Sequence, residues 1–433
     1  MHGRSLHAIA DQYFKRFGYR PPMIEQPPPK GMQLCVVIPC YDEPRITSVL
    51  DALRACNVPQ HSVELILVIN AGLHEHEVKL RNRESLKAAK AWSRENDASW
   101  LRLHCIWVDD LPAKHAGVGL ARKIGMDEAL RRFGYLDTSG MIVCLDADCT
   151  VAPNYLQVLE QVQSQSAPAS CTVHFEHQCD QMQNSDLREG IIYYELFLRY
   201  YVNALAYAGY PYSMHTVGSS MAVRADIYAL SGGMNRRKAG EDFYFLHKIV
   251  PLGGFRNIHE TSVFPAARIS HRVPFGTGKA QAAWLDNPQK RKVTYHPSTF
   301  RDMRQFMLKV PEIYQHDTGI IENKLLATLP LSVCSFLQSQ DFIEKMNEMK
   351  ANSNTFHTFY KRFFTWFDGF RALKFVHYCR DHYYKDIPLI QASAWLLTEA
   401  SIPESDDPFE LLRIYRHWDK TRQVINLTDS SSA

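Results

Sequence analysis

Four continuously apolar runs mark the first half of the chain. They are LCVVIP at Leu34, LILVIN at Leu65, LHCIWVDD at Leu103 and MIVCLDAD at Met141. Because the runs are continuous rather than alternating, they predict parallel strands that are covered on both faces. Their spacing of about thirty to forty residues leaves room for a crossover helix each time. The pattern therefore predicts an α/β layer with a mainly parallel central sheet flanked by helices.

Two segments between these runs have helical periodicity. They are ITSVLDALRAC from Ile46 and GLARKIGMDEALRRFG from Gly119. The apolar side chains of the second recur at helical spacing at Met126, Ala129, Leu130 and Phe133. Gly134 is expected to end this second helix, since glycine commonly follows the last helical turn.

The composition changes on both sides of the expected sheet domain, which we place at residues 32–285. The stretch GYRPPMIEQPPPKG combines prolines with glycines, so residues 1–31 are expected to form an N-terminal helix and a proline-rich extension. After about residue 285, charged and aromatic-rich segments such as TFHTFYKRFFTWFDGFRALKF predict a mostly helical C-terminal domain at residues 286–433. Their aromatic residues, at mixed spacing, are expected to pack helices together.

Charge and cysteine content say little about binding partners but indicate the cellular compartment. The 49 Lys and Arg nearly balance the 46 Asp and Glu, which gives no indication of a nucleic-acid partner. The 10 cysteines include no Cys-x-x-Cys pair, which favours a reducing compartment. No secretory signal and no apolar run of about 18 to 20 residues is found, so we expect a cytoplasmic protein without a transmembrane segment. Peripheral association with a membrane stays open.

Polar residues collect where the expected strands end. Asp42 and Glu43 follow the first run, Asn70 ends the second, Asp109 and Asp110 end the third, and Asp146 and Asp148 end the fourth. In open parallel sheets, ligands bind outside the carboxyl ends of the strands. The sequence therefore predicts a binding site at this edge of the sheet.

Asp146 and Asp148 stand on either side of a single alanine, directly after a buried strand. Two like charges at this spacing repel each other unless a cation lies beside them. Mg²⁺ and Mn²⁺ take hard oxygen ligands and commonly divide their coordination between carboxylates and substrate phosphates. The pair alone also fits a solvated strand end in which Asp148 starts a turn.

Four motifs occur in order along residues 34 to 245. They are VVIPCYDEP at Val36, KHAGVGLARKIGMDEA at Lys114, CLDADC at Cys144 and GSSMAVRADIYALSGGMNRRKAGEDFYF at Gly218. In this order they resemble the first strand and loop, the Gly-rich turn and helix, the Asp-x-Asp motif and the acceptor-side segment of family-2 glycosyltransferases. The resemblance implies a GT-A fold, with a nucleotide-binding α/β half followed by an acceptor-binding half.

The resemblance also implies roles for the residues that match. Asp148 would ligate Mg²⁺ or Mn²⁺ on the donor diphosphate, and Asp146 would approach the ribose or the same ion. The donor-binding residues would be Pro39, Tyr41, Glu43, Asn70, Arg122 and Asp146. Taken without the motifs, Glu43 also fits a helix-start carboxylate and Arg122 a surface salt bridge.

Asp242 is the expected general base, because inverting transfer needs a group that removes the proton of the acceptor hydroxyl. A carboxylate of ordinary pKa is already ionised at neutral pH and can accept that proton. Glu241 is the alternative base, and both residues could instead cap the helix EDFYFLHKIV.

His271 is a further candidate ligand of the metal or the diphosphate, although a lone histidine also fits a structural hydrogen bond. Arg268, Arg272 and Lys279 surround the glycines of PFGTG and could form a cationic flap over the diphosphate.

The chain departs from the family pattern in two places. Asn70, in VINAG, stands where family members often carry an aspartate that reads the base, so a preference for uracil does not follow. The Q-x-x-R-W motif of the processive synthases is absent, which favours transfer of one sugar per encounter.

We therefore expect a metal-dependent, inverting, non-processive glycosyltransferase. It would move a sugar from a nucleoside diphosphate sugar to an unidentified hydroxyl acceptor, and surface polysaccharide or glycoconjugate synthesis is the usual setting of such enzymes. A sugar nucleotidyltransferase and a non-catalytic nucleotide-sugar-binding protein remain as alternatives. A dinucleotide-dependent dehydrogenase does not fit, because the glycines of AGVGLARKIG miss the required spacing.

Overall fold

The four apolar runs form neighbouring parallel strands in the computed structural model, which describes residues 4–165, 169–270 and 276–421. The strands are β1 (Leu34–Cys40), β2 (Val63–Gly72), β3 (Leu101–Leu111) and β4 (Met141–Cys144). They lie in the order β3-β2-β1-β4, and every neighbouring pair among them is parallel. The predicted α/β layer is confirmed.

The sheet continues beyond β4 with shorter strands of mixed direction. These are β7 (Met221–Arg224), β6 (Ser170–Phe175), β8 (Phe255–Phe264) and β5 (Thr150–Val151), in that order. β7 runs antiparallel to both β4 and β6, β6 is parallel to β8, and β5 is antiparallel to β8. The sheet is thus parallel in its first half and mixed in its second.

β3 is not covered on both faces, contrary to the prediction from its apolar run. Its side chains alternate between buried and more exposed positions along the strand. The reason is its place at the end of the strand order, where one face of an edge strand is less covered than the faces of β1 and β2.

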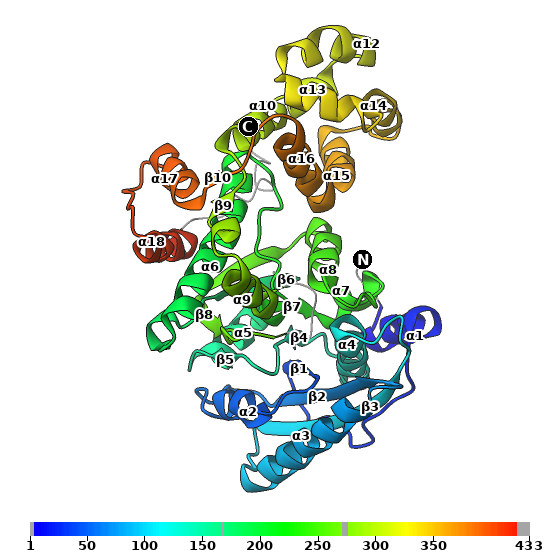
Figure 1. Cartoon of the computed structure of the whole chain (residues 1–433). Helices are drawn as coiled ribbons and strands as arrows, with labels where there is room; N and C mark the ends of the chain where they lie inside the picture. The colour runs from blue at the N-terminus through cyan, green and yellow to red at the C-terminus, as the bar shows by residue number, and fades with distance from the viewer. Residues whose placement is uncertain (1–3, 166–168, 271–275, 422–433) are drawn as a thin grey trace. The chain divides into compact units, whose positions relative to one another are not determined.

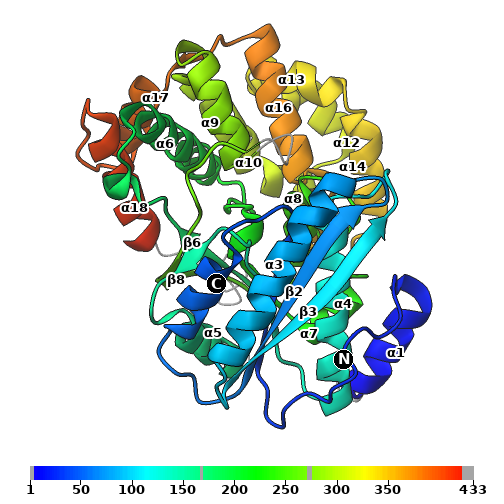
Figure 2. The ribbon, with the colours of Figure 1, turned by 60° about the horizontal axis from the view of Figure 1, so that its bottom comes forward.

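Crossover helices cover both faces of the parallel half. α2 (Ile46–Arg54) and α3 (His76–Glu95) connect β1, β2 and β3 in one direction, and Figures 1 and 2 show α3 lying along β2 and β3. α4 (Val118–Leu136) leads back from β3 to β4 on the opposite face, as the right-handed crossover rule requires. A Cβ at Gly125 would come within 2.4 Å of Val37 Cγ1, so only glycine allows α4 to pack this closely on the sheet.

α4 extends past the residue that was expected to end it. Gly134 lies inside the helix, and the chain turns at Asp137, which has a positive φ of 49°. The Asp137 N–H donates to the carbonyl oxygens of Phe133 and Gly134. An aspartate therefore takes the left-handed position that glycine usually fills, since short polar side chains tolerate it better than most.

The N-terminal extension packs on α4 through polar contacts. α1 (Leu6–Phe17) places Tyr13 Oη 2.6 Å from Asp127 Oδ1 and 2.7 Å from Lys123 Nζ. Farther along, the Met23 and Ile24 N–H groups each donate to Glu128 over 3.2 Å. These contacts give partners to charged side chains that α4 buries.

Contacts divide the chain into two units. The first comprises Met1–Gln183 and Thr216–Ala282, and the second comprises Asn184–His215 and Ala283–Ala433. The first unit also contains α5 (Tyr155–Ser164), α7 (Ala225–Leu230) and α8 (Glu241–Ile249), while α9 (Thr277–Asp286) spans the passage into the second unit. All the predicted site residues that the structure describes belong to the first unit.

The second unit is helical, as predicted for the C-terminal region. Its longer helices are α6 (Ser185–Tyr207), α10 (Pro297–Leu308), α11 (Val310–Gln315), α13 (Leu331–Gln338), α14 (Phe342–Ala351), α15 (Phe356–Trp366), α16 (Gly369–His382), α17 (Leu389–Glu399) and α18 (Pro408–Thr421). A two-stranded sheet pairs β9 (Val293–Thr294) with β10 (Ile387–Pro388). Buried Arg199 of α6 pairs with Glu195 and with Asp419 of α18. In the part of the chain that the structure describes, no helix combines the length and apolarity that crossing a membrane requires.

Candidate functional site

The direction in which strands are added to the sheet reverses beside β1. The chain moves outward from β1 to β3 and then returns through α4 to β4 on the other side of β1. Side chains at the carboxyl ends of β1 and β4 therefore flank a topological switch point, where open α/β sheets bind ligands. Tyr41 to Glu43 follow β1, and Asp146 to Asp148 follow β4.

The loop after β1 is fixed by α3. Asp42 has a positive φ of 53°, and its N–H donates to Asn82 Oδ1 over 2.9 Å. Its carboxylate accepts two bonds from Arg81, the shorter at 2.6 Å. Asn82 Nδ2 also donates to the carbonyl oxygen of Asn70 over 2.9 Å, which ties the end of β2 to this loop. Asn70 Oδ1 is buried and has no hydrogen-bond partner within the described part of the chain.

Tyr41 is held by a carboxylate that the sequence analysis missed. Tyr41 Oη donates to Glu75 Oε1 over 3.0 Å, and Glu75 Oε2 accepts the Gly72 N–H over 2.6 Å. Burial and the Glu75 carboxylate raise the pKa of Tyr41 to about 12, so the phenol stays protonated. The position of Glu75 could have identified it from the sequence, because it is a carboxylate that follows shortly after a strand ending at this edge of the sheet.

A pocket of about 440 Å³ opens beside this loop. It is lined by Tyr41, Asp42, Val78, Arg81, Arg268, Ile269 and Ser270. An aromatic ring and two aliphatic side chains thus lie with two guanidinium groups in one hollow. Its volume is in the range of small-molecule sites, and this combination suits a ligand with a flat apolar part and anionic groups.

Arg268 joins the loop after β1 to the loop after β4. Its guanidinium pairs with Glu43, and its Nη2 lies 3.3 Å from Asp148 Oδ2. Glu43 is only 1% exposed, whereas the Asp148 side chain is 28% exposed. The Arg45 N–H also donates to Glu43 Oε1, over 3.0 Å. Glu43 is therefore a buried counter-ion of Arg268 as well as a carboxylate near the start of α2.

Arg122 joins the loop after β4 to the start of α8. Its Nη2 pairs with Asp146 and its Nη1 with Glu241. The Arg122 side chain is 2% exposed, so the alternative of a surface salt bridge is wrong. A Cβ at Gly218 would lie 2.3 Å from Arg122 Nη1, so glycine is needed where the guanidinium passes. The two carboxylates keep the pKa of Arg122 above its usual range despite its burial.

The adjacent acids at the start of α8 have different surroundings. Glu241 is 2% exposed and paired with Arg122, whereas Asp242 is only part-buried and its Oδ1 accepts the Phe243 N–H over 2.7 Å. Burial raises the pKa of Glu241 to about 7, assisted by the charge of Asp242 and opposed by Arg122. Burial also raises the pKa of Asp242, again opposed by Arg122. Of the two, Asp242 is the more accessible to a ligand.

The predicted metal ligands come together only in part. Among the described residues, no three His, Cys, Asp or Glu side chains form a group that could hold a metal ion. His271 lies outside the described residues. Asp146 and Asp148 offer carboxylate oxygens that pair with Arg122 and Arg268. Such a donor set fits a cation of the Mg²⁺ type, which takes most of its ligands from phosphate oxygens and water.

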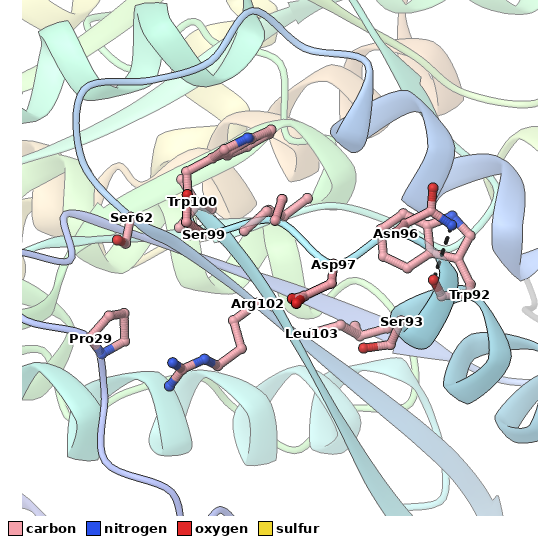
Figure 3. Close-up of a pocket in the computed structure, with 13 residues that line it drawn as sticks. Pro29, Ser62, Trp92, Ser93, Asn96, Asp97, Ser99, Trp100, Arg102 and Leu103 are labelled. Carbon is pink, nitrogen blue, oxygen red and sulfur yellow. Dashed lines mark hydrogen bonds between the residues drawn. The ribbon is translucent and has the colours of Figure 1, made fainter.

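A separate cavity of about 150 Å³ lies at the amino-terminal ends of β2 and β3 (Figure 3). Its wall includes Trp92, whose Nε1 donates to Asp51 Oδ1 over 2.6 Å, and Asn96, whose Nδ2 donates to the Trp92 carbonyl oxygen over 3.0 Å. None of the predicted site residues lines it. Since the strands here are parallel, this cavity is at the opposite edge of the sheet from the carboxylates.

Among known proteins, this chain is similar only to solved structures. No family model matches the sequence, and no curated protein matches it. S. aureus TarS 1-349 in complex with UDP-GlcNAc is 11% identical, with 74% of this chain and 92% of that chain covered and a TM-score of 0.40. Mannosyltransferase PcManGT from Pyrobaculum calidifontis, in complex with GDP-Man and Mn²⁺, is 16% identical, with 96% and 99% covered and a TM-score of 0.37. Glucosyl-3-phosphoglycerate synthase from Mycobacterium tuberculosis is 11% identical, with 60% and 73% covered and a TM-score of 0.30. At these TM-scores, any functional assignment has to come from the residues of the site.

Proposed function

We propose that this chain is a glycosyltransferase of the GT-A type, which transfers a sugar from a nucleoside diphosphate sugar to a hydroxyl acceptor. One observation carries the proposal. Carboxylates from the ends of β1 and β4 and from the start of α8 are linked by Arg268 and Arg122 beside the switch point of the sheet. The ordered motifs support membership of family 2.

The donor nucleotide is assigned to the pocket beside the loop after β1. Tyr41 and Val78 offer apolar surface to a base or ribose, and Arg81 and Arg268 offer positive charge to the diphosphate. Pro39 and Asn70 lie at the ends of the two strands next to this pocket and are assigned to the same donor site.

Asp148, with Asp146, would hold a Mg²⁺ or Mn²⁺ ion on the donor diphosphate. When bound, this ion would stabilise the negative charge that gathers on the departing nucleoside diphosphate. Arg122 fixes Asp146 from the buried side, so the Asp146 carboxylate can keep its orientation when a ligand arrives. His271 remains a candidate for the same ion.

Asp242 is proposed to accept the proton of the acceptor hydroxyl as its oxygen attacks the anomeric carbon. Direct attack of this kind inverts the configuration, and general-base assistance contributes about 10²- to 10⁴-fold to the rate. Glu241 would stay with Arg122 and hold the start of α8 in place. The absence of the Q-x-x-R-W motif supports transfer of a single sugar.

A donor screen with product analysis tests this assignment. The protein is incubated with a panel of nucleoside diphosphate sugars and, separately, with sugar phosphates and nucleoside triphosphates. Each incubation is done with and without Mn²⁺, and the products are separated by ion exchange. Release of a nucleoside diphosphate together with a transferred or hydrolysed sugar is the expected result. Release of pyrophosphate from a sugar phosphate and a nucleoside triphosphate, with no nucleoside diphosphate formed from any donor, would assign the site to a nucleotidyltransferase instead.

A further inference from the structure

Arg268 holds two carboxylates with unequal contacts. Glu43 is buried and paired directly with the guanidinium, while Asp148 is partly exposed and lies at a longer 3.3 Å from the same Nη2. A buried carboxylate is costly without a counter-charge, whereas a partly exposed one can be solvated. Glu43 is therefore the anchor of Arg268, and Asp148 is the partner that can be released.

Arg268 also faces the donor pocket. It is one of the residues that line the 440 Å³ hollow, together with Tyr41 and Arg81. Its side chain is 26% exposed, and its hydrogen bonds to Glu43 and Asp148 both use Nη2. Because guanidinium groups bind phosphate with several donors at once, this arrangement leaves donor capacity for an anion while Glu43 fixes the side chain.

We propose that Arg268 is an exchangeable counter-ion of Asp148. It pairs with Asp148 when no ion is bound, yields that carboxylate to a divalent ion, and then donates to the diphosphate that arrives with the ion. The inference rests on the proposed function, because it takes the ligand to be a nucleoside diphosphate. In addition to that function, we infer that Arg268 weakens the binding of the metal when no nucleotide is present.

Mn²⁺ binding in the absence of nucleotide tests the exchange directly. Free Mn²⁺ is measured by electron paramagnetic resonance for the full chain and its variants. Arg268→Met removes one cation that competes with the metal for Asp148, so Mn²⁺ should bind roughly 3- to 10-fold more tightly. Glu43→Gln removes the anchor and leaves the guanidinium to Asp148, so Mn²⁺ should bind more weakly by a similar factor.

Two controls separate direct contact from a general effect of charge. Arg81→Met removes the same charge from the same pocket, but Arg81 pairs with Asp42, so its effect on Mn²⁺ affinity should be clearly smaller. In the double variant Glu43→Gln with Arg268→Met, the effect of Glu43→Gln should disappear, because the residue through which it acts is gone. Circular dichroism and thermal melting identify any variant that does not fold, and Arg268→Gln, which is also uncharged, then replaces Arg268→Met.

UDP and GDP are titrated next, in the presence of Mn²⁺. Arg268→Met should bind the nucleotide that wild type prefers at least about 10-fold more weakly, although it binds Mn²⁺ alone more tightly. If wild type binds Mn²⁺ with UDP or GDP, but Arg268→Met changes Mn²⁺ affinity no more than Arg81→Met does, the exchange is wrong and the proposed function stands. If wild type with Mn²⁺ binds neither these two nucleotides nor ADP, CDP or dTDP, the proposed function fails, and the exchange fails with it.

Discussion

Arg122 and Glu241, which are 119 positions apart in the sequence, form an ion pair whose side chains are 2% and 3% exposed. The same guanidinium also pairs with Asp146 after β4. One buried side chain therefore connects the carboxylate expected near the donor with the acids expected near the acceptor. Its effect on both groups can be tested by substitution.

Replacing Arg122 with methionine is expected to shift the pH dependence of sugar transfer. Arg122 lowers the pKa of both Glu241 and Asp242, against burial, so its removal raises both values. The base is then protonated over a wider range, and the acid limb of the rate should move to higher pH. The shift is checked by measuring initial rates of nucleoside diphosphate release across the acid limb for both proteins.

The matched control for that substitution is Arg256→Met, which removes an exposed partner of Glu260. Its acid limb should coincide with that of wild type. An Arg122→Met profile whose acid limb stays in place, or moves to lower pH, would contradict the assignment of Arg122.

Gly218→Ala should disturb the same guanidinium without changing any charge. The added Cβ would lie 2.3 Å from Arg122 Nη1, so the side chain or the loop has to move, at a cost of about 1–3 kcal/mol in stability. Transfer should fall at least about 10-fold, as expected when a positioning contact is misplaced. Gly319→Ala, where nothing lies within 4 Å of the new Cβ, serves as the control and should retain wild-type activity.

The stability of the protein should depend on pH through Glu241. Burial raises its pKa from 4.5 to about 7, so the folded state holds a proton that the unfolded chain has released between these values. The stabilisation that this proton gives the folded state is complete below pH 4.5 and is lost as the pH rises through about 7. Urea unfolding at several pH values should show a steeper fall in stability over this range for wild type than for Glu241→Gln. Identical slopes would show that Glu241 keeps its ordinary pKa.

Tyr13→Phe should loosen α1 from α4. The hydroxyl donates to Asp127 over 2.6 Å and accepts from Lys123 over 2.7 Å, and its loss leaves buried polar groups with fewer partners. We expect a loss of about 1–3 kcal/mol in the free energy of unfolding. Tyr135→Phe is the control, since that side chain is exposed and should change stability by less than about 0.5 kcal/mol.

The sequence predicted the parallel strands and the edge of the sheet to which the site is assigned, because continuous burial and the polar residues that follow it are local properties. It did not predict that Glu43 and Asp148 share Arg268, since that pairing joins segments 225 and 120 positions apart. Glu75 was missed for a similar reason, because its role depends on Tyr41 of another loop. The extent of α4 was misjudged at Gly134, because the turn uses Asp137 in a left-handed conformation.

Asp242 is the proposed base for sugar transfer at this site. The most direct measurement compares wild type and Asp242→Asn for both donor affinity and sugar transfer, with the preferred nucleoside diphosphate sugar and Mn²⁺. In the variant, we expect an unchanged donor dissociation constant and a loss of transfer of at least about 10²-fold. Transfer at the wild-type rate by Asp242→Asn would contradict this assignment of the base.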